Sequence, residues 1–128
     1  MTITSKNNAQ IKRIRRLHRR KYRREEGLFL IEGVRWVREA LTQPERVETV
    51  IYCPALLTSG IGYETVSIAS QCPDIQVLET NEEVFCSFTT RKNPAGIAAV
   101  MQQQWSSLDV LAGSSQVWVA LNAVQYPG

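Results

Sequence analysis

The first 24 residues of this chain contain no acidic side chain, although the full sequence of 128 residues has 12. The same segment holds ten of the 15 basic residues, whereas residues 25–128 carry the other five together with every acidic residue. The modest formal net charge of +3 therefore results from a basic arm attached to an acidic body. Because like charges at this density repel one another, we expect a polyanion that carries phosphate groups to bind the arm.

Long apolar runs are also missing. No stretch approaches the roughly 18 uncharged apolar residues that a membrane-spanning helix needs, and no apolar signal-peptide segment follows the basic start. Organelle transit peptides are rich in arginine and poor in acids, but they are also rich in serine, and only Ser5 precedes Glu25 here. These absences predict a cytoplasmic protein.

Cysteine and histidine are scarce. The three cysteines, Cys53, Cys72 and Cys86, are an odd number without a Cys-x-x-Cys spacing, which predicts small buried side chains in a reducing compartment. The only histidine, His18, stands among arginines that would repel a divalent cation. The sequence therefore predicts that the chain holds no metal ion.

The basic segment has the pattern of one amphipathic helix that runs to about Arg24, with Ser5, Asn7 and Asn8 as candidate N-caps. A narrow apolar stripe follows the helical spacing: Ile11, Ile14, Leu17, His18 and Tyr22. Helices that lie on anionic membranes or in calmodulin-type grooves have a broader apolar face. We therefore expect the stripe to dock the helix on its own domain.

The acidic body alternates between strand and helix patterns. Strands are predicted at 28–31, 47–52, 75–78 and 97–101, helices at 34–42 and 62–71, and a short helix after the N-cap Asn81. The glycines at 60 and 62 are too few for a dinucleotide-binding motif and are predicted to form a loop. The alternation indicates an α/β fold with a mainly parallel sheet and helices on both faces.

The amino-acid composition of the sequence changes after residue 104. Serine and glycine mark residues 105–115 as a linker, and residues 117–121 predict a further buried strand. A lone strand has unpaired backbone groups on both edges. We therefore expect residues 1–104 to form one domain and residues 116–128 to be the truncated start of a second.

The sequence lacks the residue sets of common catalytic sites, since no carboxylate pair and no Ser/His/Asp set can be assembled. The loop before the turn Asn93-Pro94-Ala95-Gly96 could simply lead into a strand, or it could offer hydroxyls and cations to a sugar-phosphate backbone. Aromatic residues are too dispersed for a stacking platform. The residues expected to bind nucleic acid are Lys12, Arg13, Arg15, Arg16, Arg19, Arg20, Lys21, Arg23, Arg24, Thr89, Thr90, Arg91 and Lys92.

Several motifs resemble one enzyme family. They are Arg20-Lys21, Glu26-Gly27, Phe29-Leu30-Ile31-Glu32-Gly33, Glu39-Ala40-Leu41, Asn93-Pro94-Ala95-Gly96-Ile97, Leu121-Asn122 and Pro127-Gly128. Together they resemble the SpoU-type (SPOUT, TrmH-like) RNA 2′-O-ribose methyltransferases. The Glu-Gly-x-Phe-x-Ile-Glu-Gly pattern behind a basic helix is the most specific of these matches.

The resemblance implies a small three-layer α/β/α sandwich like that of the kink-turn-binding ribosomal proteins, preceded by a basic helix and linked to a trefoil-knotted catalytic domain. It also implies S-adenosylmethionine as methyl donor, a structured ribosomal or transfer RNA as substrate, and dimerisation through the catalytic domain. Only Asn122 and Pro127 correspond to the first catalytic motif, so this chain alone is expected neither to bind the cofactor nor to transfer methyl groups. The alternative is a stand-alone RNA-binding module or ribosome-assembly factor without enzymatic activity.

Overall fold

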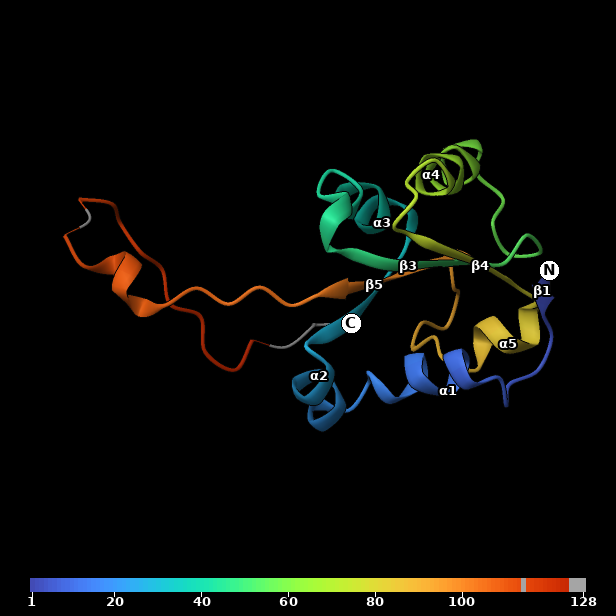
Figure 1. Ribbon diagram of the computed structural model, residues 1–128, viewed down its shortest axis with the longest axis horizontal. Helices are drawn as coiled ribbons and strands as arrows, with labels where there is room; N and C mark the ends of the chain where they lie inside the picture. The colour runs from blue at the N-terminus through green and yellow to red at the C-terminus, as the bar shows by residue number, and fades with distance from the viewer. Residues whose placement is uncertain (114, 125–128) are drawn as a thin grey trace.

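The computed structural model describes residues 1–113 and 115–124 and has a five-stranded sheet at its centre (Figure 1). The strands are β1 (Thr2–Ile3), β2 (Leu28–Glu32), β3 (Val47–Tyr52), β4 (Gln76–Thr80) and β5 (Ile97–Gln102). The helices are α1 (Ala9–Arg16), α2 (Arg20–Glu26), α3 (Val34–Ala40), α4 (Gly60–Ser70) and α5 (Glu82–Cys86), with short 3-10 turns η1 (Pro44–Arg46) and η2 (Leu108–Leu111). The predicted α/β class is confirmed, and so are the four predicted strands, with bounds shifted by one or two residues.

The sheet is mixed rather than mainly parallel. Its strand order is β1-β4-β3-β5-β2, in which β1, β4 and β3 pair in parallel and β5 is antiparallel to both β3 and β2. The expectation of a mainly parallel sheet is wrong at β5, which runs opposite to the strands on both sides of it. Between Thr80 and Ile97 the chain contains the five-residue α5 but no helix that runs back along the sheet. Strand β5 therefore starts at the end of the sheet where β4 stops, since Glu79 and Ile97 both pair with Tyr52.

Helices cover both faces of the sheet, and each face has its own core. Helices α1 and α5 pack on one face and α3 and α4 on the other (Figure 1). Strand β5 contributes to both cores, because Ala98 and Val100 point to the first face while Ile97, Ala99 and Met101 point to the second. This is the reason that its sequence is a continuous apolar run.

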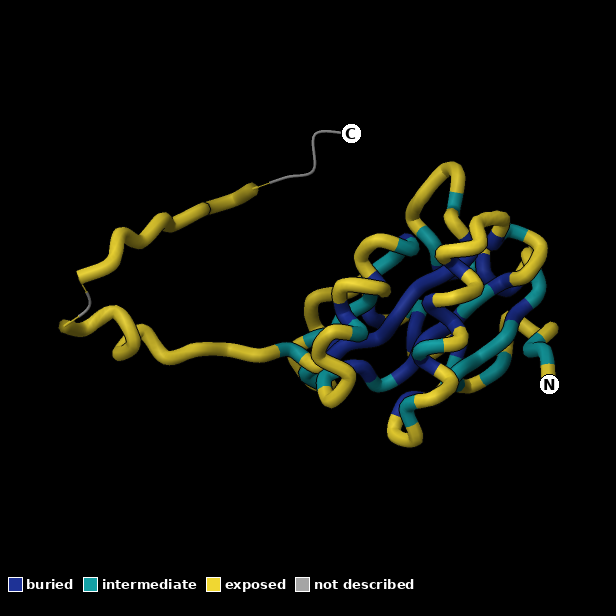
Figure 2. Tube along the Cα trace, turned by 90° about the horizontal axis from the view of Figure 1, so that it is seen from above, coloured by how far each residue is buried: buried dark blue, intermediate teal, exposed yellow. Residues whose placement is uncertain are grey.

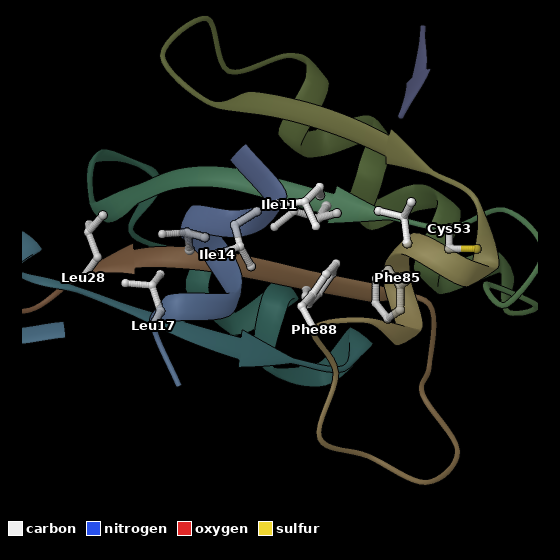
Figure 3. Close-up of a cluster of buried hydrophobic side chains, with 11 residues drawn as sticks. Ile11, Ile14, Leu17, Leu28, Cys53, Phe85 and Phe88 are labelled. Carbon is white, nitrogen blue, oxygen red and sulfur yellow. The ribbon is translucent and has the colours of Figure 1, made fainter. Parts of the chain in front are cut away.

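The basic segment forms two helices instead of the single helix that the sequence predicted. Asn8 caps α1, since its side chain accepts hydrogen bonds from the backbone N–H groups of Gln10 (2.9 Å) and Ile11 (3.4 Å). Arg19 then has an extended backbone, which ends the first helix before α2 begins. The break lets Leu17 enter the core beside Leu28 and Ile14 (Figure 3).

The apolar stripe therefore ends earlier than its spacing suggested. Ile11, Ile14 and Leu17 are buried, whereas His18 is exposed and Tyr22 is only half-buried. Extending the stripe through the last two residues was wrong, because the chain turns after Leu17. The docking of the helix on its own domain, in contrast, is confirmed by the three buried side chains.

Two further details differ from the sequence-based expectations. Helix α4 begins at Gly60, where the Ser59 hydroxyl accepts a hydrogen bond from the Gly62 N–H (3.0 Å), so the predicted loop is the first turn of a helix. Of the three cysteines, Cys53 is buried, Cys72 is half-buried and Cys86 is exposed on the short helix α5. The expectation of uniformly buried cysteines is therefore wrong for Cys86.

After Gln103 the chain extends away from the sheet, and its described residues from 104 onward are exposed (Figure 2). Residues 117–121 form no strand, and Val117 is 93% exposed. A strand needs a neighbouring strand for its backbone hydrogen bonds, and within the described part of the chain none pairs with these residues. Asn122 is likewise exposed and outside any helix or strand, and Pro127 lies outside the described residues.

Gly96 is required at the start of β5 for two reasons. Its φ of +76° lies in the left-handed region, and a Cβ there would come within 2.6 Å of the Leu57 backbone nitrogen. The positive φ expected for this glycine is thus confirmed, whereas residues 93–96 contain bends at 93 and 96 in place of the predicted turn. Gly27, which ends α2, has a similar φ of +65°, but a Cβ added to it would meet nothing within 4 Å.

We predict that Gly96→Ala lowers the free energy of unfolding by about 2 kcal/mol or more, since strain and a backbone clash add together. Gly27→Ala is the matched control and is expected to cost about 1 kcal/mol from strain alone. Urea unfolding followed by circular dichroism measures both. Equal losses in the two variants would contradict the clash.

The short edge strand β1 is fastened to the sheet by side chains as well as by backbone pairing. The Thr2 hydroxyl and the Tyr52 hydroxyl (2.8 Å) both donate hydrogen bonds to the carboxylate of Glu79. The hydrogen bond with Glu79, followed by burial, raises the pKa of Tyr52 from 10.0 to about 12. The bonds from Thr2 and then Tyr52 lower the pKa of Glu79.

The pair should therefore stabilise the fold fully between the ordinary pKa of a glutamate, 4.5, and pH 10, and lose this contribution as the pH rises from 10 towards 12 or falls into the acid range where Glu79 is protonated. We predict that absorbance titration of the tyrosines shows one late component, which Tyr52→Phe removes. Tyr63→Phe leaves the Tyr52–Glu79 pair intact and should retain that component. A late component that persists in Tyr52→Phe would refute the assignment.

Candidate nucleic-acid interface

Helix α1 presents its cations outward because its apolar side is used for packing. Ile11 has no exposed surface, and Ile14 and Leu17 are almost fully buried on the sheet (Figure 3). Most basic residues on the remaining faces of α1 and α2 are therefore exposed, while Arg15 and Arg23 are half-buried. The structure thus gathers the basic arm into a surface on the α1 side of the sheet.

Arg13 differs from its basic neighbours because two carboxylates neutralise it. Its Nε lies 2.5 Å from Glu26 Oε2 and its Nη1 lies 2.6 Å from Glu48 Oε1. The hydrogen bond to Glu48 raises the pKa of Arg13, against the smaller lowering effect of burial. This side chain, which is predicted to bind nucleic acid, connects α1 to the end of α2 and to β3.

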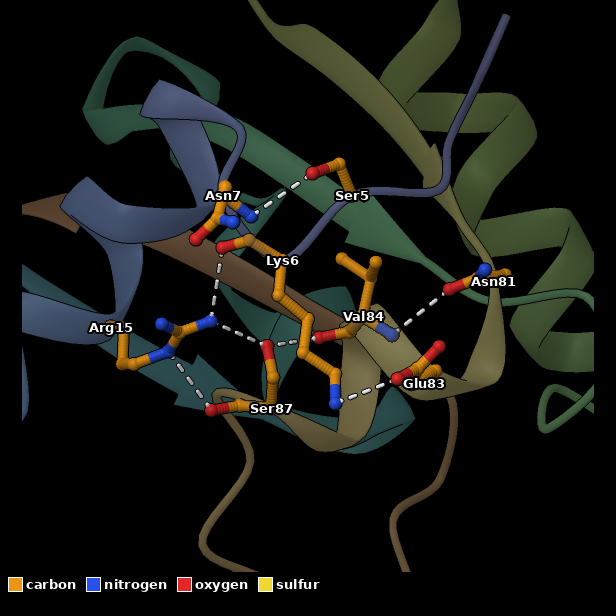
Figure 4. A network of polar contacts seen from close by, with 8 residues as sticks. All are labelled: Ser5, Lys6, Asn7, Arg15, Asn81, Glu83, Val84 and Ser87. Carbon is orange, nitrogen blue, oxygen red and sulfur yellow. Dashed lines mark hydrogen bonds and ion pairs between the residues drawn. The ribbon is translucent and has the colours of Figure 1, made fainter.

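Arg15 ties α1 to the end of α5 (Figure 4). Its guanidinium donates hydrogen bonds to the Ser87 carbonyl (3.1 Å), the Ser87 hydroxyl (2.8 Å) and the Lys6 carbonyl (3.3 Å). The ammonium of Lys6 lies 2.8 Å from Glu83, and this contact lowers the pKa of that carboxyl. The partners of Arg15 are neutral, so the arginine retains its positive charge while it fixes the position of α1.

Arg23 supports the turn between the two basic helices. Its Nη1 donates to the carbonyls of Leu17 (2.9 Å) and His18 (2.8 Å), which are left without helical partners where α1 ends. The position of the guanidinium is therefore set by the fold. Lys21 has a weaker partner, Glu25, at 3.9 Å one turn along α2.

The loop of residues 89–92 lies beside the end of α1. The ring of His18 hydrogen-bonds to the carbonyl of Phe88, one residue before the loop begins. Within the loop, the Thr89 hydroxyl accepts from the Arg91 N–H (3.2 Å) and the Thr90 hydroxyl donates to Glu32 (3.4 Å). Arg91 and Lys92 are exposed, so the structure brings this loop and the basic arm together on one side of the molecule.

Five cations of the arm have neither a carboxylate partner nor a side-chain hydrogen bond among the residues that the structure describes: Lys12, Arg16, Arg19, Arg20 and Arg24. Three of them line a shallow hollow with Arg15 and Tyr22, whose ring centroid lies 5.5 Å from the guanidinium carbon of Arg16. The other two line a second hollow with Arg23, Gln103 and Trp105. Unpaired cations in concave surfaces attract anions, and guanidinium groups suit phosphate in particular.

The second hollow was not foreseen in the sequence. Trp105 lies 81 residues beyond Arg24, within the predicted linker. No pattern in the neighbouring sequence indicates that it lies close to α2. The pairing of Leu28 with Gln102 brings the end of β5 to the start of β2, directly after α2. Aromatic residues that are dispersed along the sequence thus lie next to cations in the folded chain.

The described parts of the chain lack two other kinds of site. Within residues 1–113 and 115–124, no group of three or more His, Cys, Asp and Glu side chains is arranged to hold a metal ion. Nor does any helix in those ranges have the length and apolar character needed to cross a bilayer. What the surface offers chemically is therefore positive charge, hydroxyls and aromatic rings.

The fold and its basic surface define a small α/β domain of the kind found in SpoU-type RNA methyltransferases. The family model for the MRM3-like substrate binding domain matches residues 8–99. The chain belongs to this family, and the resemblance stated from its motifs is confirmed.

Individual relatives agree with this assignment. Over 126 residues the chain is 29% identical to 23S rRNA (guanosine(2553)-2'-O)-methyltransferase RlmP of Bacillus subtilis (strain 168), a match that covers 98% of the chain and 46% of that protein. A solved RNA 2'-O ribose methyltransferase is 30% identical with a TM-score of 0.68, covering 84% of the chain and 40% of its own. An AdoMet-bound rRNA methyltransferase from Sinorhizobium meliloti is 27% identical with a TM-score of 0.64, covering 83% and 38%. The chain therefore spans less than half the length of these relatives.

The two basic hollows do not suit AdoMet, which is bound in the structure of the Sinorhizobium meliloti relative. AdoMet carries a positively charged sulfonium, which the cations of the two hollows would repel. Asn122, which the resemblance assigned to the first catalytic motif, is exposed and outside any helix or strand. The basic surface is therefore suited to an anionic ligand and not to this cofactor.

Arginines with and without carboxylate partners should differ in how much they contribute to the free energy of unfolding. We predict that Arg13→Gln lowers the free energy of unfolding by about 1 kcal/mol or less, since it leaves Glu26 and Glu48 without their shared cation on a half-exposed surface. Arg19→Gln, which removes a cation without a carboxylate partner, should change it by less than about 0.5 kcal/mol. Chemical denaturation of both variants is the test, and a larger loss for Arg19→Gln would reverse the assignment.

Proposed function

We propose that this chain is the RNA-recognising domain of a SpoU-type rRNA or tRNA 2′-O-ribose methyltransferase. The observation that carries the proposal is the set of five unpaired cations on α1 and α2, beside the exposed loop of residues 89–92. A surface of this kind binds the phosphate backbone, which supplies much of the affinity of RNA-binding proteins. The family assignment and the methyltransferase relatives support the same conclusion.

The proposal assigns different roles to the predicted binding residues. Lys12, Arg16, Arg19, Arg20 and Arg24 neutralise phosphates, and Arg15, Lys21 and Arg23 add charge from positions that the fold holds in place. Thr89, Thr90, Arg91 and Lys92 contact the RNA nearer the target nucleotide, where hydroxyls can bond to sugar oxygens. The 2′-hydroxyl is the group that distinguishes RNA from DNA, and it is the acceptor of the methyl group in this reaction.

The proposal also covers the organisation of such an enzyme. Residues 1–104 form the recognition domain, an α/β/α sandwich like that of the kink-turn-binding ribosomal proteins. Residues 105–115 are a linker, and residues 116–128 begin the catalytic domain. Methyl transfer from S-adenosylmethionine and dimerisation belong to that catalytic domain, so the 128 residues alone are inactive. The protein acts in the cytoplasm, where its structured RNA substrate is found.

Salt dependence provides the test of RNA binding. We predict that filter binding of an RNA stem-loop gives an affinity that falls steeply with salt, and that the double substitution of Arg16 and Arg19 by Gln flattens the slope by roughly 1.4 to 1.8. The reason is that each phosphate contact contributes about 0.7 to 0.9 to this slope.

The matched control removes two arginines from the opposite face of the sheet. Arg35 and Arg38 lie on α3, so replacing both by Gln changes the net charge equally and should leave the slope unchanged. A flat response of the wild-type chain to salt would contradict the proposal. So would an equal effect of the two double substitutions, which would indicate that net charge alone governs binding.

A further inference from the structure

We infer that the hollow between α2 and the end of β5 binds one unpaired nucleotide of RNA, with the base stacked on Trp105 and the adjacent phosphates on Arg20 and Arg24. This inference rests on the proposed function and makes it more specific. The proposed function rests on charged contacts to phosphates. The inference adds an aromatic contact, which forms only with a base that is not stacked on its neighbours.

Trp105 has a hydrogen-bonded side chain although the residue is 84% exposed. Its Nε1 donates a hydrogen bond to Gln103 Oε1 (3.2 Å). Gln103 is itself bound to the junction of α2 and β2, because its backbone N–H donates to the Gly27 carbonyl (2.7 Å) and its side-chain amide donates to the Leu28 carbonyl (3.4 Å). The indole is therefore tied to the end of the basic arm and still presents its surface to solvent.

The cations around this ring are arranged for an anion. Arg23 forms one wall of the hollow, and its bonds to two backbone carbonyls fix its position. Arg20 and Arg24 line the same hollow and have no carboxylate partner among the described residues. Two unpaired guanidinium groups beside an exposed aromatic ring match the two parts of a nucleotide, phosphate and base.

A nucleotide explains this combination better than a purely electrostatic ligand does. An acidic peptide or a regular duplex would use the arginines but would leave the indole in water, since duplex bases remain stacked on one another. An unpaired base can leave its stack and cover the ring. The structure therefore indicates a loop or bulge of the RNA at this position rather than a continuous helix.

The test compares two RNA probes, a stem-loop and a blunt duplex of equal length, across a range of salt concentrations. Trp105→Ala should weaken stem-loop binding by roughly five- to 100-fold at every salt concentration without changing the slope, because stacking releases no counterions. Trp105→Phe should retain most of the affinity. Duplex binding should be the same in all three proteins.

Trp36→Ala is the control, since Trp36 is an exposed tryptophan on α3 at the opposite face of the sheet. A second readout uses the double variant Trp36→Phe and Trp118→Phe, which leaves Trp105 as the sole tryptophan. Its fluorescence should be quenched by the stem-loop and much less by the duplex. Urea unfolding should show Trp105→Ala to be as stable as the wild type, because the exposed ring contributes little to the core.

The outcomes separate the two proposals. If the wild type binds both probes with a steep salt dependence and Trp105→Ala binds like the wild type, the nucleotide site is wrong and the proposed function stands. An equal loss for stem-loop and duplex would also overturn the site. If the wild type binds neither probe, the proposed function fails and this inference fails with it.

Discussion

The burial of Ile11, Ile14 and Leu17 against the sheet is the interaction on which the basic surface depends. Each buried side chain of this size contributes roughly 1.5 to 3 kcal/mol, while each pair of exposed like charges one turn apart costs a few tenths. Three such anchors outweigh the repulsion along α1, so a segment that would be unstable alone is held as a helix on the domain. The repulsion that remains is directed to solvent, where a polyanion can relieve it.

The fold itself uses part of the charge that the sequence offers. Arg13 is neutralised by two carboxylates, Arg15 clamps α1 to α5, and Arg23 satisfies carbonyls at the break between α1 and α2. These contacts position the helices and leave a smaller set of cations free for a ligand. The division follows from the geometry: residues that face the body find partners there, and residues on the outer side do not.

Much of the fold could be predicted, because apolar runs mark β2 to β5 and Asn81 marks the start of α5. Strand β1 could not, since two residues carry no pattern, and the apolar run of β5 does not show its direction, which depends on how residues 81–96 connect it to β4. The residues of the basic surface could be predicted from the sequence, but the contacts that they make in the fold could not. Glu48 and Ser87 are distant in sequence from the arginines that they contact, and only the folded chain shows which cations are occupied.

The break after Leu17 links the core to the second hollow. A continuous helix would carry the cations after residue 17 away from the sheet, and α2 would not reach β2. Because the chain turns, α2 ends at Gly27 and leads directly into β2, whose first residue pairs with the last residue of β5. Gln103 then bonds to that same junction and places Trp105 beside α2. The packing of Leu17, the pairing of β2 with β5 and the hydrogen bonds of Gln103 thus together bring the ring of Trp105 to the arginines of α2.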